Sequence, residues 1–162
     1  MESARYADVL RRLATSEVEF IVVGLMAGVP RGVPVVTADL DLVHRRERQN
    51  VARLLQVLGD LDAIYRHDPR RLRPGESHLM GPGHNLLVTS HGDIDCLGTV
   101  GTGRTYEDLR DRAPEVELGG GVRVRVIDLP TLIELKEEAG RPKDLAVLPV
   151  LRATLAETLR RS

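Results

Sequence analysis

Apolar residues recur at helical spacing in several parts of the chain. Within residues 3–15, Tyr6, Val9, Leu10 and Leu13 fall on one side of a helix and charged residues fall on the other. The same spacing predicts helices over residues 46–58 and from 142 onwards. A helix over 131–139 is predicted by Asp128 and Pro130 at its start and Gly140 at its end, and residues 106–112 could form a shorter one. In the last of the long helices we expect one buried face, made of Leu145, Leu148, Leu151 and Leu155.

Strands are predicted where β-branched residues cluster or where apolar and polar residues alternate. These segments cover residues 19–23, 35–43, 61–65, 84–89 and 93–97, and a triple glycine between 115–118 and 122–127 is typical of a hairpin. Gly24 ends the first strand, residues 25–28 could form one helical turn, and the prolines over 29–34 predict irregular chain. Residues 66–83 are charged and rich in proline and glycine, which predicts a loop. The expected fold class is α/β, one mixed β-sheet flanked by helices.

Length and composition favour one globular domain. The 162 residues can bury a sizeable core, which must be aliphatic because the chain has one Phe and no Trp. We expect a single domain over 1–162, with a core of about 19–127 and C-terminal helices over about 128–162. The net charge of −1 argues against a broad nucleic-acid-binding surface. A lone cysteine, Cys96, and the absence of a signal peptide or a membrane-length apolar run predict a cytoplasmic protein with no membrane partner.

Two acidic pairs are the strongest chemical signal. Asp39 and Asp41 are two residues apart in a predicted strand, so both side chains leave the same face. Asp93 and Asp95 repeat the pattern in a later strand. If the strands are neighbours, three or four carboxylates converge, and Mg²⁺ prefers such oxygen ligands. The alternative for either pair alone is an acidic, solvent-facing strand.

The order of these pieces resembles the nucleotidyltransferase superfamily of DNA polymerase β, and most closely its small bacterial and archaeal members, some of which act as toxins or antitoxins. The resemblance rests on the strand and turn at Gly24 and Leu25, on Arg31, on Thr37 before Asp39 and Asp41, on Asp95, and on the ending from residue 132 to 145. It implies a single nucleotidyltransferase-like domain in which Asp39, Asp41 and Asp95 are catalytic and bind Mg²⁺ or Mn²⁺ in a two-metal mechanism. Asp95 could also serve as general base. Asp93, on the same face, would support Asp95 without binding the metal ion itself.

The same resemblance implies a nucleoside triphosphate, ATP being one example, as the donor of the nucleoside monophosphate. Nucleotide and phosphate would be bound by Gly24, Leu25, Arg31, Thr37, Lys136, Arg141 and Lys143. The hydroxyl acceptor is left open between RNA, protein and a small molecule. For Lys136, Arg141 and Lys143 the alternative is a solvated, charged helix end. For Arg31 it is a structural role in which the side chain packs over its own loop.

One departure from the family pattern supports a second hypothesis. Leu25 stands where the family usually has Gly or Ser to cradle the triphosphate, so a hydroxyl donor is missing and an apolar side chain takes its place. A catalytically degenerate module with the same fold, for example one half of a toxin–antitoxin pair that binds a protein partner, is therefore the alternative to an enzyme. If Leu25 fills the groove above Asp39 and Asp41, this second hypothesis gains.

Overall fold

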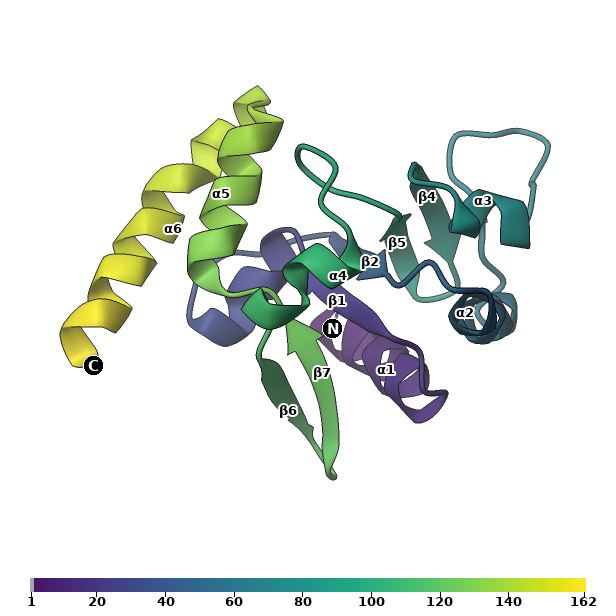
Figure 1. The fold of residues 1–162 in the computed structure, drawn as a ribbon, viewed down its shortest axis with the longest axis horizontal. Helices are drawn as coiled ribbons and strands as arrows, with labels where there is room; N and C mark the ends of the chain where they lie inside the picture. Colours follow the sequence, from purple (N-terminus) through teal and green to yellow (C-terminus); the bar gives the residue numbers. More distant parts are fainter. Residues whose placement is uncertain (1) are drawn as a thin grey trace.

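A computed structural model describes residues 2–162, with side chains from Arg5 onwards. Figure 1 shows its mixed sheet, which has seven strands in the order β3-β4-β5-β2-β1-β7-β6. The strands are β1 Phe20–Val23, β2 Asp39–His44, β3 Ile64–Tyr65, β4 His84–Thr89, β5 Gly92–Leu97, β6 Glu115–Gly119 and β7 Val122–Val126. The helices are α1 Glu2–Thr15, α2 Arg48–Asp60, α3 Glu76–Met80, α4 Tyr106–Leu109, α5 Leu129–Ala139 and α6 Pro142–Arg161, with 3₁₀ helices at Leu25–Arg31 and Arg110–Arg112. The expected α/β class and the mixed sheet are confirmed.

Strands β1, β2 and β5 form the centre of the sheet and position its acidic residues. β2 runs antiparallel to β1 and parallel to β5. The alternate residues Leu40, Leu42, Ile94 and Cys96 are all buried in the core. Because side chains alternate along a strand, the residues between them point to the opposite face of the sheet.

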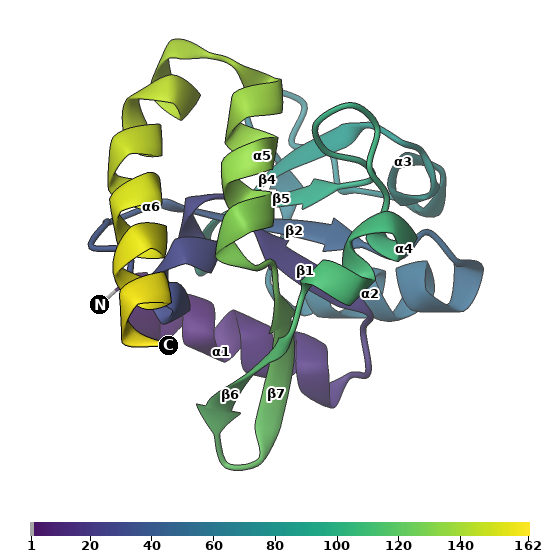
Figure 2. The same ribbon diagram turned by 60° about the vertical axis from the view of Figure 1, so that its left-hand side comes forward.

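Helix α1 covers the apolar face of the sheet, and α5 and α6 form a separate antiparallel pair (Figure 2). The hydroxyl of Tyr6 in α1 donates to the backbone carbonyls of Ala38 and Asp93, which ties the helix to β2 and β5. Asp128 caps α5, because its side chain accepts a hydrogen bond from the Thr131 amide, and Gly140 ends that helix in the left-handed conformation. The short Gly140–Arg141 link then lets α6 turn back along α5.

Several predicted boundaries were wrong. The strand expected over 35–43 begins only at Asp39, since its pairing with β5 starts at Asp39 and Asp93 and Val36 lies exposed before it. The segment expected to be irregular over 29–34 begins instead as the end of the 3₁₀ helix Leu25–Arg31, which includes Pro30. The strand expected over 61–65 shrinks to Ile64–Tyr65.

The helical predictions also needed correction in three places. The helix expected over 46–58 begins at Arg48, because the Glu47 carboxylate accepts hydrogen bonds from two amides of the first turn, and it runs through Gly59 to Asp60. The loop expected over 66–83 contains α3, a single short helix with only Leu79 buried, too short to produce a periodic signal. Leu145 does not join the buried face of α6, where Leu148 and Leu151 are buried, but is 49% exposed.

Within residues 2–162, no helix is long and apolar enough to cross a membrane.

Candidate functional site

The two strands that carry the acidic pairs are neighbours in the sheet, which is the condition for their carboxylates to converge. β2 and β5 are parallel neighbours in a register that sets Asp39 opposite Asp93 and Asp41 opposite Asp95. Since the residues between them face the core, the four carboxylates share one face of the sheet. The sheet register therefore gathers negative charge that the sequence holds more than 50 positions apart in the chain.

Gly24 and Asp41 are in direct contact where β1 ends. A Cβ added to Gly24 would lie 2.2 Å from Asp41 Oδ2, and the glycine also has a φ of +66°. Both features require glycine. The expected role of Gly24 was close approach of a phosphate to its backbone, but in this structure the Asp41 carboxylate occupies the space next to its α-carbon.

Asp41 lies in an electrostatic environment that disfavours its charge. Burial raises the pKa of Asp41 to about 7, and the neighbouring charge of Asp95 contributes in the same direction, followed by that of Asp39. Asp41 Oδ1 is buried without a hydrogen-bond partner. A cation next to this oxygen would relieve both the lost solvation and the mutual repulsion of the carboxylates.

The opposite wall of the site is basic and is organised around Asp144 of α6. This carboxylate is fully buried; Arg141 Nε lies 2.6 Å from its Oδ2 and Lys136 Nζ lies 3.2 Å from its Oδ1. Although burial alone would raise the pKa of Asp144, the hydrogen bonds from Arg141 and Lys136 lower it below the ordinary value. Lys143 is exposed and has no ion pair with any residue from 5 to 162. Asp144 therefore fixes the orientation of two cations and leaves a third free.

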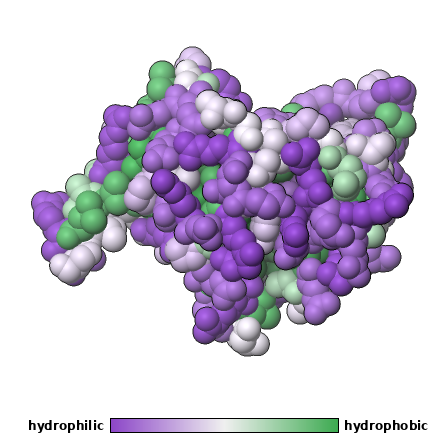
Figure 3. All heavy atoms as spheres, in the orientation of Figure 1, coloured by the Kyte–Doolittle hydropathy of each residue, from purple (hydrophilic) through white to green (hydrophobic). Residues whose placement is uncertain are grey.

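A cleft of about 670 Å³ separates the acidic wall from the basic one. Such a volume is within the range of small-molecule sites. The acidic wall comes from β2 and β5, and the basic wall from α5, α6 and the link between them. The residues that complete the lining are Leu25, Thr37, Arg66, His84, Leu86 and Gly101. Figure 3 shows the molecular outline indented between the part formed by α5 and α6 and the part that carries β4 and α3.

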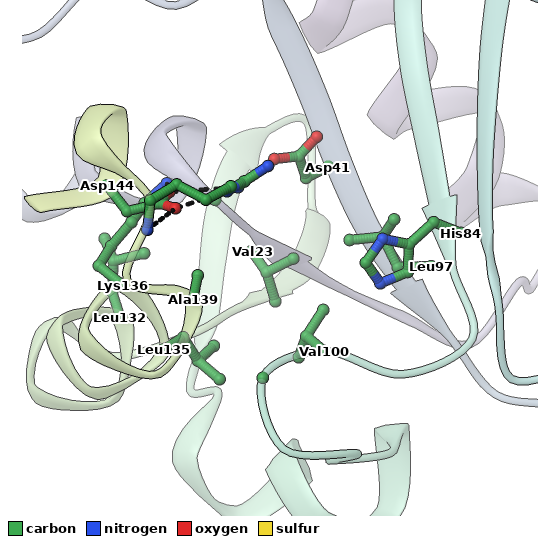
Figure 4. A pocket seen from close by; sticks show the side chains of 13 residues that line it. Val23, Asp41, His84, Leu97, Val100, Leu132, Leu135, Lys136, Ala139 and Asp144 are labelled. Carbon is green, nitrogen blue, oxygen red and sulfur yellow. Dashed lines mark hydrogen bonds and ion pairs between the residues drawn. The ribbon is translucent and has the colours of Figure 1, made fainter.

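Most of the residues expected at the site line this cleft. They are Leu25, Thr37, Asp39, Asp41, Asp95, Lys136, Arg141 and Lys143. Leu25 is half-buried on the wall and does not fill the groove, so it leaves the space above the carboxylates open. Gly24 lines an adjoining pocket of about 110 Å³, which shares Asp41 and Lys136 with the cleft (Figure 4).

Arg31 is the expected phosphate-binding residue that the structure does not bring to the cleft. Its guanidinium donates to the carbonyl of Val126 in β7, at 2.7 Å, and is absent from the cleft lining. The 3₁₀ helix directs this side chain back onto the sheet. Arg31 thus lies apart from the other residues expected to bind phosphate, as the alternative of a structural role for this side chain would have it, and its contact with phosphate stays a prediction.

Sequence reasoning missed a basic residue on the acidic wall. Arg66 follows β3, and its Nη2 lies 2.9 Å from Asp95 Oδ1 while its Nη1 lies 3.7 Å from Asp93 Oδ2. The only hint in the sequence was its place directly after a predicted strand. Asp144 was also missed as the anchor of the basic wall, although an acidic residue at the third position of a helix, here two residues after Pro142, is typical of a helix N-terminus.

The carboxylates are the type of ligand that a divalent cation prefers, but their side chains are not arranged around a common point. Among residues 5–162, whose side chains the structure describes, no group of three or more His, Cys, Asp or Glu side chains is placed to hold a metal ion as the side chains stand. Asp95 instead has Arg66 as its partner. The unpartnered Asp41 Oδ1, with the Asp39 carboxylate on the same face of the sheet, nevertheless fits Mg²⁺ or Mn²⁺ in chemical kind, because these ions take hard oxygen ligands and fill other positions with water.

Comparison with known proteins supports the fold. A crystal structure from Thermotoga maritima, described as a putative nucleotidyltransferase, aligns with a TM-score of 0.52 over 95% of this chain and 87% of that one, at 18% sequence identity. No protein-family model matches the chain, and no curated protein matches its sequence. At this level of identity the likeness concerns the fold alone. The chain has a nucleotidyltransferase-like α/β fold.

Proposed function

We propose that the chain is a metal-dependent nucleotidyltransferase that moves a nucleoside monophosphate from a nucleoside triphosphate to a hydroxyl acceptor. One observation carries the proposal. The parallel register of β2 and β5 presents Asp39, Asp41 and Asp95 on one wall of a cleft whose other wall carries Lys136, Arg141 and Lys143. A triphosphate with bound cations needs such an arrangement, because the acids hold the cations and the bases neutralise the phosphates.

The roles of the residues follow from their surroundings. Asp39 and Asp41 would hold the divalent ions, Mg²⁺ or Mn²⁺, and Asp95 would complete one ion site or accept the proton of the acceptor hydroxyl. When bound, the ions supply positive charge to the reacting phosphate and lower the pKa of the acceptor hydroxyl. Lys136 and Arg141, oriented by Asp144, would bind phosphate oxygens together with Lys143. Leu25 and Thr37 would border the nucleotide.

The acceptor is proposed only as a hydroxyl on RNA, protein or a small molecule. His84 and Leu86, two exposed residues of β4, border the cleft and give solvent access to that side of it. Arg66 and Asp95 lie on that same side. An acceptor that enters there would reach Asp95 without crossing the basic wall.

A second candidate is a catalytically degenerate module with this fold, such as one member of a toxin–antitoxin pair that binds a protein partner. The ion pair between Arg66 and Asp95 favours it, since the carboxylate expected to hold a catalytic ion already has a cationic partner. The position of Leu25 on the wall gives this candidate no further support, because the cleft stays open.

Nucleotide binding tests the proposed function. Mg²⁺-dependent binding of ATP, GTP, CTP and UTP is measured by isothermal titration calorimetry for the native chain, Asp39→Asn and Asp41→Asn. We expect binding to the native chain and its loss in both variants. Asp62→Asn is the matched control, because Asp62 is 75% exposed and lies outside the cleft. Undiminished binding in both cleft variants would refute the proposal.

Label transfer then separates the two candidates. The protein is incubated with α-labelled NTPs, Mg²⁺ or Mn²⁺, and total cell RNA and protein. Label that becomes covalently attached in the native reaction, but not with Asp41→Asn, supports the enzyme and defeats the degenerate module. Nucleotide binding without any transfer supports the module.

A further inference from the structure

Arg66 holds an unusual position among the cleft residues, because it is a cation on the acidic wall. It directly follows β3 at the edge of the sheet, and its backbone amide donates to the carbonyl of Leu86 at 2.9 Å. This anchor places the side chain across β4 and over β5. The guanidinium is thereby held at the same face of the sheet as the four aligned carboxylates.

The contacts of the guanidinium are well defined. Nη1 donates to the carbonyl of Leu87 at 2.7 Å, and Nη2 donates to Asp95 Oδ1 at 2.9 Å. The side chains of Arg66 and Asp95 are only 17% and 13% exposed. An ion pair with so little solvent around it is stronger than one on an open surface, and salt screens it less.

We propose that Arg66 is an internal counter-ion that competes with a divalent cation for Asp95, so that this ion pair sets the affinity of the cleft for the metal. The inference rests on the proposed function and deepens it. A carboxylate oxygen that accepts a hydrogen bond from a guanidinium has less electron density to offer a metal, and the two cations repel each other at short range. Binding of the ion at Asp95 thus requires Arg66 to withdraw.

The surroundings allow such a withdrawal. β3 is only two residues long and lies at the sheet edge, and the chain after Arg66 continues into a loop in which His67 and Arg71 have positive φ. Rotation of the arginine side chain would break its hydrogen bonds to Leu87 and Asp95 and its longer ion pair with Asp93, all of which lie on the cleft face of the sheet. The phosphates of an incoming nucleotide offer the released guanidinium a new anionic partner. The pair is therefore an autoinhibitory contact that substrate can open.

The test measures metal affinity rather than turnover. Mn²⁺ binding is followed by electron paramagnetic resonance and by calorimetry, without nucleotide, for the native chain, Arg66→Gln and Arg66→Lys. We expect Arg66→Gln to lower the Kd for Mn²⁺ by about tenfold or more. Arg66→Lys keeps the charge but loses the planar guanidinium, so its Kd for Mn²⁺ is expected to lie between those of the native chain and Arg66→Gln.

Arg70→Gln is the matched control, because it removes the same charge from the same segment while its guanidinium pairs with Asp68 outside the cleft. Its Kd should equal that of the native chain. Circular dichroism and thermal unfolding check each variant. If Arg66→Gln does not fold, Arg66→Lys alone decides, and a native Kd in that folded variant overturns the inference.

The outcomes separate this inference from the proposed function. If Arg66→Gln binds Mn²⁺ as the native chain does while Asp41→Asn loses binding, competition by Arg66 is wrong and the metal site stands. Weaker binding by Arg66→Gln would make Arg66 an orienting partner of Asp95 and would also overturn competition. If neither the native chain nor Arg66→Gln binds Mn²⁺, both the inference and the metal-dependent function fall.

Discussion

The carboxylate of Asp41 lies so close to the α-carbon of Gly24 that a methyl group there would sit 2.2 Å from Asp41 Oδ2. Gly24 also has a φ of +66° and a ψ of −168°, a backbone conformation that is essentially restricted to glycine. The end of β1 and the candidate metal ligand therefore depend on each other. Neither residue can change without consequences for the other.

Gly24→Ala is expected to destabilise the fold and to move Asp41. Strain and overlap together should cost about 2–4 kcal/mol of unfolding free energy. Gly32→Ala is the matched control, since Gly32 has a φ of +89° but nothing within 4 Å of its added Cβ, so only the strain, about 1 kcal/mol, should remain. Urea unfolding measures both variants. Equal losses in the two would show that the contact with Asp41 contributes nothing.

Asp144 is expected to be the most sensitive residue of the basic wall. Asp144→Asn keeps the shape but removes the charge that Arg141 and Lys136 share, which should cost about 2–4 kcal/mol. Glu157→Gln is the control, because Glu157 pairs with exposed Arg160 and Arg161 and should cost less than about 1 kcal/mol. Chemical denaturation at pH 7 compares them. A cost for Asp144→Asn no larger than that of Glu157→Gln would contradict the anchoring role.

The same carboxylate gives a pH dependence of known sign. Since the pKa of Asp144 is lowered in the folded state, its contribution to stability is present above the ordinary value of 3.8 and is lost as the pH falls below 3.8 through the folded value. The stability difference between the native chain and Asp144→Asn should thus be constant from pH 7 to 5 and shrink below pH 4. Urea unfolding at each pH measures the difference. A stability difference that grows as the pH falls would contradict a lowered pKa of Asp144 in the folded state.

The acidic wall could be predicted from sequence because it depends on local periodicity. Asp39 and Asp41, and likewise Asp93 and Asp95, share a face whatever their neighbours are, since residues two apart in a strand always do. Their convergence needed one further assumption, that the two strands are adjacent, and the register confirms it. The same alternation places Cys96 on the opposite face, where it is buried.

The remaining features depend on contacts that no local pattern encodes. Arg66 reaches Asp95 only because the two-residue β3 pairs with β4, and a strand that short leaves almost no periodic signal. The direction of the Arg31 side chain could not be predicted, because it depends on how the end of a short 3₁₀ helix packs against β7. Asp144 looked like an ordinary charged residue at a helix start, and only the packing of α6 on α5 buries it.

His44 is expected to make stability fall in mild acid. Its ring is buried, Nε2 lies 2.7 Å from the carbonyl oxygen of Leu79, and Nδ1 has no partner. Burial lowers the pKa of His44, because the charged ring would lose its solvation there, and the positive charge of Arg46 acts in the same direction. The unfolded chain therefore binds this proton first, and stability should be complete above pH 6.5 and decline below it, towards the folded value.

The variant His44→Gln isolates this effect. Gln can still donate to the Leu79 carbonyl but does not titrate between pH 8 and 5. The native chain should lose stability relative to His44→Gln as the pH falls from 7.5 to 5. Thermal and urea unfolding at both pH values measure the difference. A native chain that becomes relatively more stable in acid would contradict the buried, neutral state of His44.

Leu25 bears on whether the cleft binds nucleotide well or poorly. Its side chain lines the cleft beside Thr37 and Asp41 and supplies no hydrogen-bond donor. Under the proposed function, Leu25→Ser places a hydroxyl within the phosphate path. One added neutral hydrogen bond is worth roughly 0.5–1.5 kcal/mol, so NTP affinity should rise by about two- to tenfold.

Leu86→Ser is the matched control for Leu25→Ser, because Leu86 lines the same cleft from β4, 38% exposed, on the side away from the basic wall. Calorimetric titration with an NTP and Mg²⁺ compares both variants with the native chain. Leu25 also packs partly against the core, so Leu25→Ser should lose some stability, which thermal unfolding records separately. Binding that is tighter in Leu25→Ser than in Leu86→Ser would come from the change at residue 25, through the added hydroxyl or through the removal of apolar bulk from the phosphate path. A folded Leu25→Ser that binds no better than Leu86→Ser would mean that residue 25 does not face the phosphates.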